Sequence, residues 1–287
     1  MIHPKLPQTT EAVAAHYDEL DPFYREVWGE HLHHGYWATG RETAAEATEA
    51  LVDLVADRLR LAPGLRVCDI GCGYGATAQR LAERHRLEVT GVTVSAAQAA
   101  AAALRRAGAG SVSFRREDWL ANRFADASFD RAYAIESSEH MADKQRFFAE
   151  AFRTLAPGGL LAVCAWLARP DPRPWEVRHL LEPICREGRL PGMGEEADYR
   201  RLAERAGFTL LASEDLSRRV RRTWSICARR LVRKLVTRPR YARFLLDPNA
   251  ANRAFVLTLV RLWVAYRTRS MRYGLLLFEK PPAAVGR

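Results

Sequence analysis

The chain has 287 residues, of which 48% are hydrophobic and 27% charged, so it can bury one sizeable core and is too apolar to be intrinsically disordered. Its net charge of +10 is unevenly placed, because the segment from Leu216 to Tyr273 holds 16 Lys and Arg residues and one acid, Asp247. No stretch approaches the ~20 consecutive apolar residues of a membrane span, and the N-terminal sequence lacks the apolar core of a signal peptide, so a cytoplasmic location is expected.

The first predicted elements are a helical cap and an α/β core. Residues 1–62 form the cap, with a helix over 44–62 that carries apolar residues along one side. Over 63–169, strands alternate with helices of about a dozen residues, which favours a parallel sheet covered by helices on both faces. The strands are predicted at 65–70, 87–94, 111–117, 129–136 and 157–168, and the helices at 75–86, 96–107 and 142–155.

The rest of the chain departs from this alternation. Pro157-Gly158-Gly159 predicts a helix stop and a turn before the fifth strand. The proline density after Arg169 predicts an irregular lid or short helices. The predicted segments are a cap insertion at 170–200, a core helix and strand at 201–215, a basic helical cap insertion at 216–269, and a final strand and tail at 270–287.

A glycine-rich loop follows the first predicted strand. The sequence VCDIGCGYGA, residues 67–76, places Asp69 ahead of Gly71, Gly73 and Gly75. Glycines let the backbone turn sharply and bring its N–H groups against a ligand, as dinucleotides and S-adenosylmethionine (SAM) require. The dinucleotide pattern needs the spacing G-x-G-x-x-G and an acid ~20 residues further on. This chain has neither, since its second strand ends in GVTVSAAQ.

This loop resembles motif I of the class I SAM-dependent methyltransferases. The sequences REDW after the third strand, FADASFDRAYAIESSEHM around the fourth and LAPGGLLAV before the fifth resemble the family's later motifs in the same order. The resemblance implies a Rossmann-like α/β fold with a seven-stranded, mostly parallel sheet whose last strand is antiparallel. It also implies SAM as cofactor, with Asp69 and the glycines at its methionine end and Asp118 and Trp119 at its adenine.

A narrower resemblance covers nearly the whole chain. The sequences VWGEHLHHGYW, GVTVSAAQ, IESSEHMADKQRFFAE and YGLLLFEKP are similar to the γ-tocopherol methyltransferase group, which includes plant alkaloid N-methyltransferases and lies close to sterol C-methyltransferases. In that group Thr and Gln replace the usual ribose acid, a pattern that maps here to Thr93, Ser95 and Gln98. The resemblance implies a lipophilic small-molecule acceptor.

Carbon methylation of an aromatic or isoprenoid natural product is the expected reaction. The alternatives are transfer to nitrogen or oxygen, methylation of an isoprenoid diphosphate, and a cyclase or non-catalytic binding protein built on the same fold. The glycine loop is intact, which disfavours a protein that has lost its cofactor site.

The stretch HLHHGYW, residues 31–37, holds three histidines within four positions. Zinc ligands usually come from separated elements, and the five cysteines form no CxxC pair, so we expect reduced thiols and no metal. We expect Tyr36 and Trp37 to form a lid whose aromatic faces meet the sulfonium cation. Tyr17 and Tyr24 are predicted to reach the methionine carboxylate or, alternatively, to pack on a helix face.

Methyl transfer from a sulfonium needs alignment of acceptor, methyl and sulfur, and a base only where the acceptor must lose a proton. Glu136, His140 and His34 are the candidate bases by motif position, and histidine titrates near neutrality. In the alternative interpretation His140 makes a structural hydrogen bond, and Glu136 binds the cofactor or a substrate cation.

The basic segment 218–240 predicts an amphipathic helix with a cationic face. Three interpretations are open: a solvated face, peripheral contact with an anionic membrane, and binding of an acidic group such as a diphosphate. No nucleic-acid recognition motif accompanies the charge, so no nucleic-acid partner is expected. A homo-oligomer is also open, because an N-terminal helix ahead of the core could be exchanged between subunits.

Overall fold

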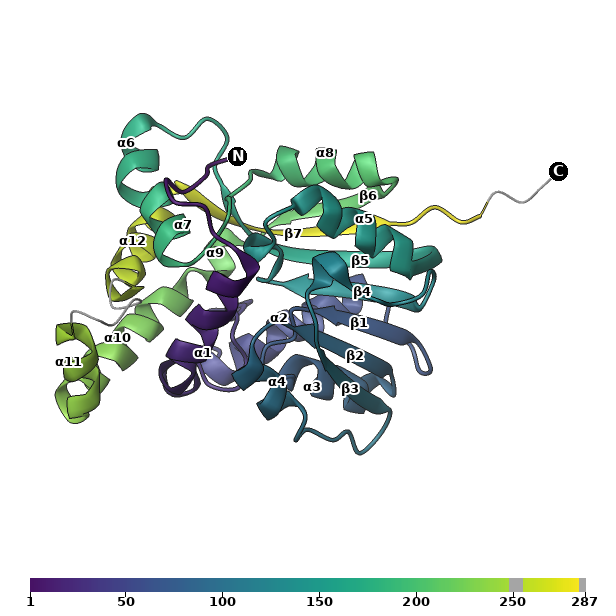
Figure 1. The fold of residues 1–287 in the computed structure, drawn as a ribbon, viewed down its shortest axis with the longest axis horizontal. Helices are drawn as coiled ribbons and strands as arrows, with labels where there is room; N and C mark the ends of the chain where they lie inside the picture. The colour runs from purple at the N-terminus through teal and green to yellow at the C-terminus, as the bar shows by residue number, and fades with distance from the viewer. Residues whose placement is uncertain (248–254, 284–287) are drawn as a thin grey trace.

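A mostly parallel seven-stranded sheet forms the centre of the molecule (Figure 1). The computed structural model describes residues 1–247 and 255–283, so parts of the predicted basic insertion and tail, 248–254 and 284–287, lie outside the described residues. The strand order is β3-β2-β1-β4-β5-β7-β6, and β7 runs antiparallel to both neighbours, which confirms the predicted fold class. The strands are β1 (Arg66–Ile70), β2 (Glu88–Thr93), β3 (Ser111–Arg116), β4 (Phe129–Ile135), β5 (Leu155–Ala168), β6 (Thr209–Asp215) and β7 (Met271–Glu279).

Successive strand residues point to opposite faces, and each face has its own apolar core. Leu51 and Leu81 bring α2 and α3 onto one face, and Phe148 and Tyr199 bring α5 and α8 onto the other. Side-chain oxygens of Thr43, Ser95 and Asp143 accept backbone N–H groups and start α2, α4 and α5. The core helices are α2 (Ala44–Arg58), α3 (Ala76–His85), α4 (Ala96–Ala102), α5 (Lys144–Thr154) and α8 (Glu196–Ala206).

Two local predictions differ from the structure, and a third is resolved in favour of one alternative. The helix predicted over 96–107 ends at Ala102, because Arg105 turns back and donates to the Tyr74 carbonyl oxygen at 2.6 Å. Pro157-Gly158-Gly159 lies inside β5 instead of preceding it, with only Gly158 in the left-handed region. The proline-rich segment after Arg169 forms short helices, one of the two predicted alternatives, in α6 (Pro174–Glu176), η3 (Val177–Leu181) and α7 (Glu182–Glu187).

The remaining helices gather at one end of the molecule (Figure 1). They are α1 (Thr10–Val27), α9 (Ser217–Val220), α10 (Arg222–Thr237), α11 (Pro239–Leu246) and α12 (Phe255–Thr268). Glu26 at the end of α1 accepts from Lys234 Nζ at 2.9 Å, from the Tyr241 hydroxyl at 2.8 Å and from Arg240, and so ties α1 to α10 and α11. No helix among the described residues is long and apolar enough to cross a membrane.

Candidate active site

A cleft opens where β1, β2, β3 and β4 end, and it encloses about 700 Å³ including its mouth. In parallel sheets the carboxyl ends of the strands form the ligand-binding edge. Loops that are far apart in sequence therefore meet here. The predicted residues that line the cleft are Tyr17, Gly71, Gly73, Thr93, Gln98, Asp118, Trp119, Glu136 and His140.

The glycine loop has the backbone that its sequence predicts. Gly71, Gly73 and Gly75 all have positive φ, at 85°, 50° and 75°. A Cβ on Gly71 would lie 2.2 Å from the Ser137 Cβ, whereas a Cβ on Gly73 would meet only Leu32, at 3.9 Å. Packing against Ser137 thus requires a glycine at position 71, whereas a side chain at position 73 would extend into the space of the cleft. Gly75 starts α3 and faces Phe114, outside the cleft.

Asp69 lies at a second pocket, of about 340 Å³, behind the glycine loop. Among the described residues its buried Oδ2 makes no hydrogen bond of good geometry, and the Tyr133 hydroxyl, also buried without such a bond, is the neighbour that opposes the rise of its pKa. Burial raises the pKa of Asp69 to about 7. A buried carboxylate oxygen without a donor is costly, so this site fits a ligand that supplies a cationic N–H group, as the methionine ammonium of SAM does.

The other end of the cleft carries the predicted ribose and adenine contacts. Thr93 donates to Gln98 Oε1 at 2.7 Å, and both side chains are buried beside the cleft. Ser95 does not line the cleft: its hydroxyl accepts from the Gln98 backbone N–H and donates to Asp18. Asp118 accepts from the Leu120 backbone N–H at 2.9 Å, which fixes the turn into η1 (Trp119–Ala121).

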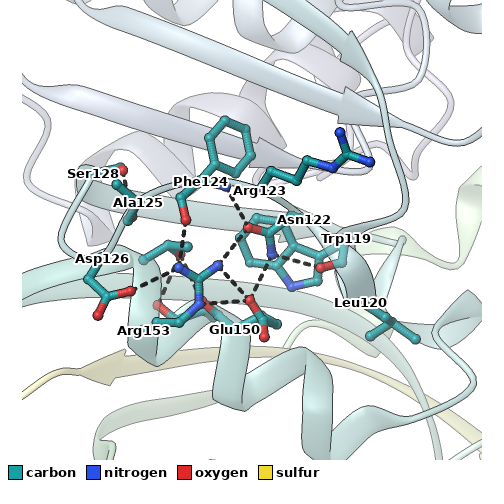
Figure 2. Close-up of polar contacts among 12 residues, drawn as sticks. Trp119, Leu120, Asn122, Arg123, Phe124, Ala125, Asp126, Ser128, Glu150 and Arg153 are labelled. Carbon is teal, nitrogen blue, oxygen red and sulfur yellow. Dashed lines mark hydrogen bonds and ion pairs between the residues drawn. The ribbon is translucent and has the colours of Figure 1, made fainter.

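Arg153 on α5 holds this adenine side in place (Figure 2). Its guanidinium donates to the Phe124 carbonyl at 2.6 Å and to Asn122 Oδ1 at 2.9 Å, and Asn122 in turn donates to the Trp119 carbonyl at 2.8 Å. Glu150 accepts from the same guanidinium at 2.7 Å. The network fixes the segment that begins at Trp119, so Arg153 positions a wall of the cleft without lining it.

The lid over the cleft is α1 and not the predicted pair of Tyr36 and Trp37. Three side chains hold α1: Thr10 donates to Asp118 at 3.3 Å, Asp18 accepts from Ser95 at 2.5 Å and from the Ala97 backbone N–H at 3.1 Å, and Asp21 accepts from the Tyr74 hydroxyl at 2.7 Å. Thr10, Val13 and Tyr17 from α1 line the cleft.

Tyr36 and Trp37 lie elsewhere, because the chain leaves the cleft after His34. The Gly35 backbone N–H donates to Thr223, and the Trp37 backbone N–H donates to the Arg219 carbonyl. The buried Trp37 ring donates to the Glu42 carbonyl at 3.0 Å. Neither ring lines the cleft or the glycine-loop pocket, so the prediction of a Tyr36–Trp37 lid is not supported by this geometry.

A third, largely aromatic pocket of about 500 Å³ adjoins the cleft and is distinct from the pocket at Asp69. The two cavities share Tyr17, Leu32, Glu136 and His140, so these four residues surround the junction. Tyr24 lines this pocket and not the cofactor cleft. The other lining residues are Trp28, Glu139, Trp166, Gly188 and Leu190. We call this cavity the acceptor pocket.

Glu136 is buried at the junction and has an unusual left-handed backbone, with φ of 55°. One carboxylate oxygen accepts from the His34 backbone N–H at 2.7 Å and from the Tyr273 hydroxyl at 2.8 Å, and the other from His34 Nδ1 at 2.9 Å and from Trp166 Nε1 at 2.8 Å. Burial alone would raise its pKa, but the His34 contacts outweigh burial and lower the pKa to about 2. Four donors occupy all four lone-pair positions, which suits an anchor and not a base.

His34 lies behind Glu136 and lines neither cavity. Its Nδ1 donates to Glu136, and its ring packs against Trp224 and Tyr273 with centroid separations of 4.9 and 5.0 Å. The geometry therefore gives His34 a supporting position rather than direct access to an acceptor.

His140 faces the junction and is joined to the lid. Its Nδ1 lies 3.3 Å from the Arg189 carbonyl oxygen, which can only accept, so Nδ1 carries the proton. Nε2 then accepts from the Tyr17 hydroxyl at 2.9 Å. Burial lowers the pKa of His140 to about 3, so the imidazole is neutral at physiological pH and its Nε2 lone pair accepts from the Tyr17 hydroxyl.

Several site residues were missed by sequence reasoning. Glu139 is three residues from Glu136 in the motif IESSEHM, but nothing in the spacing distinguishes the two carboxyls. Thr10 and Val13 belong to a helix whose place over the cleft depends on contacts between residues 77 and 108 positions apart. His31 and His33 line the glycine-loop pocket and share Thr77 as a hydrogen-bond partner. Within residues 1–247 and 255–283 no group of three or more His, Cys, Asp or Glu is placed to hold a metal.

The fold and the family define a class I SAM-dependent methyltransferase, an enzyme that uses SAM as its cofactor. More narrowly, the chain belongs to the mycolic acid cyclopropane synthetase family, whose profile matches residues 5–242. The predicted resemblance to methyltransferases of the tocopherol and sterol group is confirmed at this level.

Individual relatives are natural-product enzymes. The 27-O-demethylrifamycin SV methyltransferase of Amycolatopsis mediterranei (strain S699) is 35% identical over 230 residues, covering 77% of this chain and 82% of the relative. The chloroplastic tocopherol O-methyltransferase of Arabidopsis thaliana is 28% identical, covering 94% of this chain and 82% of the relative. The crystal structure of the [4+2]-cyclase SpnF is similar at 29% identity and a TM-score of 0.78, covering 99% of this chain and 100% of SpnF.

Proposed function

We propose that this enzyme transfers a methyl group to a hydroxyl oxygen of a hydrophobic natural product. The observation that carries the proposal is the junction of the two cavities, where an aromatic pocket meets the cofactor cleft beside buried, proton-accepting side chains. A hydroxyl acceptor needs such groups, because its oxygen must lose a proton when it gains the methyl.

The cofactor supplies, when bound, a methyl group on a positively charged sulfur. The residues that would hold it are Asp69 and the glycine loop at one end, and Thr93, Gln98 and Asp118 at the other, since they line the two cavities. α1 covers the cleft and excludes water, which would compete with the acceptor. The contribution of the chain to the reaction is thus mainly alignment and desolvation.

The walls of the acceptor pocket indicate the kind of acceptor. Tyr24, Trp28 and Trp166 present rings, and Leu190 is apolar, so the pocket favours a flat or ring-containing hydrophobic molecule. The polar groups lie at the junction with the cofactor cleft, where Tyr17 and His140 form one hydrogen-bonded pair. An acceptor hydroxyl directed to this pair would lie at the point of methyl transfer.

The comparisons favour oxygen over carbon without deciding between them. The two relatives described above are named for O-methylation, and a relative 35% identical over 230 residues is a sterol C-methyltransferase of Oryza sativa subsp. japonica. Carbon methylation, the reaction expected from the sequence, needs no hydroxyl deprotonation at the start. Because methylation at carbon also releases a proton, the groups at the junction suit either acceptor, and the relatives named for O-methylation support oxygen.

The test is product analysis with purified protein and SAM. We would offer hydroxylated ring compounds, including 27-O-demethylrifamycin SV, with matched amines and isoprenoids, and locate the new methyl group by NMR. An O-methyl product is expected. A methyl group found only on carbon or nitrogen would contradict the proposal.

Cyclisation is the second candidate, since the similarity to SpnF spans nearly the whole of both chains. A cyclase would convert a polyene substrate without consuming SAM. Measuring S-adenosylhomocysteine (SAH) release alongside substrate loss separates the two activities.

We also propose peripheral contact with an anionic membrane through α10 and α12. Arg229, Val232, Arg233 and Val236 are exposed at helical spacing on α10, with Val236 82% exposed. On α12, Leu257, Val260 and Trp263 form an exposed apolar stripe, and Arg267 lies 4.0 Å above the Trp263 ring. Exposed apolar side chains beside arginines are typical of helices that lie in a lipid interface.

Sedimentation with vesicles tests this contact. Wild type is expected to sediment with phosphatidylglycerol vesicles and much less with phosphatidylcholine, and Val236→Asp is expected to stay in solution. Leu104→Asp is the matched control, because Leu104 is 81% exposed and lies just beyond α4, outside α10 and α12. Equal binding by the two variants would contradict a specific surface.

A further inference from the structure

Two glutamates lie three residues apart at the end of β4, and their surroundings differ. Glu136 accepts four hydrogen bonds and is saturated. Glu139 is equally buried, at 1% exposure, and accepts from the Trp166 backbone N–H at 2.6 Å and from the Ser138 hydroxyl at 3.2 Å, while its own backbone N–H also stabilises the carboxylate. These donors are fewer than the four that Glu136 has, so the Glu139 carboxyl keeps a lone pair available.

Glu139 also lacks a direct counter-ion among the residues that the structure describes. Lys144, the nearest cation in sequence, is buried and donates to two backbone carbonyls, of Glu139 at 3.2 Å and of Met141 at 3.1 Å, rather than to the carboxylate. Glu139 lines the acceptor pocket together with His140, although unlike His140 it does not line the cofactor cleft. A buried carboxyl with free lone pairs and no ion pair is poorly explained by a structural role.

Building on the proposed hydroxyl methylation, we propose that Glu139 is the catalytic base of this enzyme. The acceptor O–H bond breaks as its proton moves to a Glu139 oxygen, the acceptor oxygen bonds to the methyl carbon, and the methyl–sulfur bond breaks with its electron pair kept by sulfur. The proton then leaves Glu139 for solvent, so one proton is released for each methyl transferred.

The protonation behaviour of the neighbouring groups agrees with this role. Burial raises the pKa of Glu139 to about 7, near the value that suits a general base at neutral pH. His140, whose pKa burial lowers to about 3, is a far weaker base, and its hydrogen bond with Tyr17 makes it a positioning residue for the acceptor hydroxyl. The other groups whose charges act on Glu139 or respond to it are Tyr17, Glu136, Lys144, Cys164, Tyr199 and Tyr266.

The sign of the pH dependence follows from the raised pKa. A base must be ionised to act, so the rate with wild type should rise with pH through about 7 and then level. In Glu139→Gln the amide oxygen can still accept the Trp166 N–H, so the fold is retained while the base is lost. We expect kcat to fall ~10²–10⁴-fold, the rise near pH 7 to disappear, and the affinity for SAH to stay within about threefold of wild type.

Glu136→Gln is the matched comparison, since it changes the same kind of side chain three residues away. It should lower the stability but keep the rise of rate near pH 7. If wild type methylates a hydroxyl acceptor and Glu139→Gln keeps both its rate and its pH profile, the assignment of Glu139 is overturned while hydroxyl methylation stands.

An infrared measurement tests the role of Glu139 without any turnover of substrate. The difference spectrum of wild type minus Glu139→Gln should contain a protonated carboxyl signal that titrates near pH 7 and shifts when SAH and a phenol are added together. A carboxyl already ionised at pH 5, or one insensitive to the phenol, would overturn the proposal even if no hydroxyl acceptor is turned over.

Discussion

In the glycine loop, alanine substitutions at Gly71 and Gly73 can separate the role of the loop in packing from its role in ligand binding. Gly71 and Gly73 both have positive φ, so alanine at either position costs about 1–2 kcal/mol in backbone strain. At Gly71 the new Cβ would also lie 2.2 Å from the Ser137 Cβ, and relief of that overlap adds about 1–3 kcal/mol. We therefore expect Gly71→Ala to lower the free energy of unfolding by about 2–5 kcal/mol and Gly73→Ala by about 1–2 kcal/mol.

Gly64→Ala is the control for strain alone. Gly64 has φ of 82°, has nothing within 4 Å of its would-be Cβ, and lies before β1 at the opposite edge of the sheet. Its variant should match Gly73→Ala in stability but bind SAH normally. Gly73→Ala places a methyl group in the cleft, and we expect its SAH affinity to fall ~10-fold, or about 1.4 kcal/mol.

Chemical denaturation and isothermal titration with SAH provide both readouts. The order of stability expected is wild type, then Gly64→Ala and Gly73→Ala together, then Gly71→Ala. An unfolding midpoint for Gly71→Ala equal to that of Gly64→Ala would refute the packing argument. Wild-type SAH affinity in Gly73→Ala would refute the assignment of the cleft.

Three further outcomes are expected. Asp18→Ala removes the contact between α1 and the start of α4, so SAH should dissociate faster in stopped-flow displacement; an unchanged rate would mean that α1 is not the lid. Arg153→Lys loses the paired donors to Phe124 and Asn122 and should weaken SAH binding several-fold in titrations without altering the pH profile of the rate. The pKa of Glu136 is lowered from 4.5 to about 2, so its carboxylate stabilises the fold above pH 4.5 and loses that effect as the pH falls toward 2. In denaturation curves over this range, the free energy of unfolding of wild type should therefore fall by roughly 3 kcal/mol more than that of Glu136→Gln.

Much of the fold was predictable because its signals are local. Strand and helix alternation from Leu65 onward gave the order of the core elements, and the structure confirms the sheet with its antiparallel last strand. Boundaries were less accurate where a distant residue intervened. Arg105 lies beyond the end of α4 and donates to the Tyr74 carbonyl, a long-range contact that helix propensities do not predict.

The site was predictable in part for the same reason. Gly71, Gly73, Thr93, Gln98 and Asp118 line the cleft because each follows a strand whose end faces the ligand edge. Outside the strand ends, Tyr17 was predicted and lines the cleft, whereas Thr10 and Val13 were missed. Tyr36 and Trp37 have aromatic rings suited to a cation, yet the anchoring of Gly35 and Trp37 to α10 and α9 directs them away.

By itself, the sequence determined the sheet, the glycine loop and hence the cofactor, since these depend on backbone geometry within a few residues of each motif. Only the tertiary structure decided which helix covers the cleft and which carboxyl keeps free lone pairs. Tyr17 meets His140 across 123 residues, and Glu136 is saturated by donors from three separate segments. Such contacts fix the electrostatic state of a side chain, and they exist only once the chain has folded.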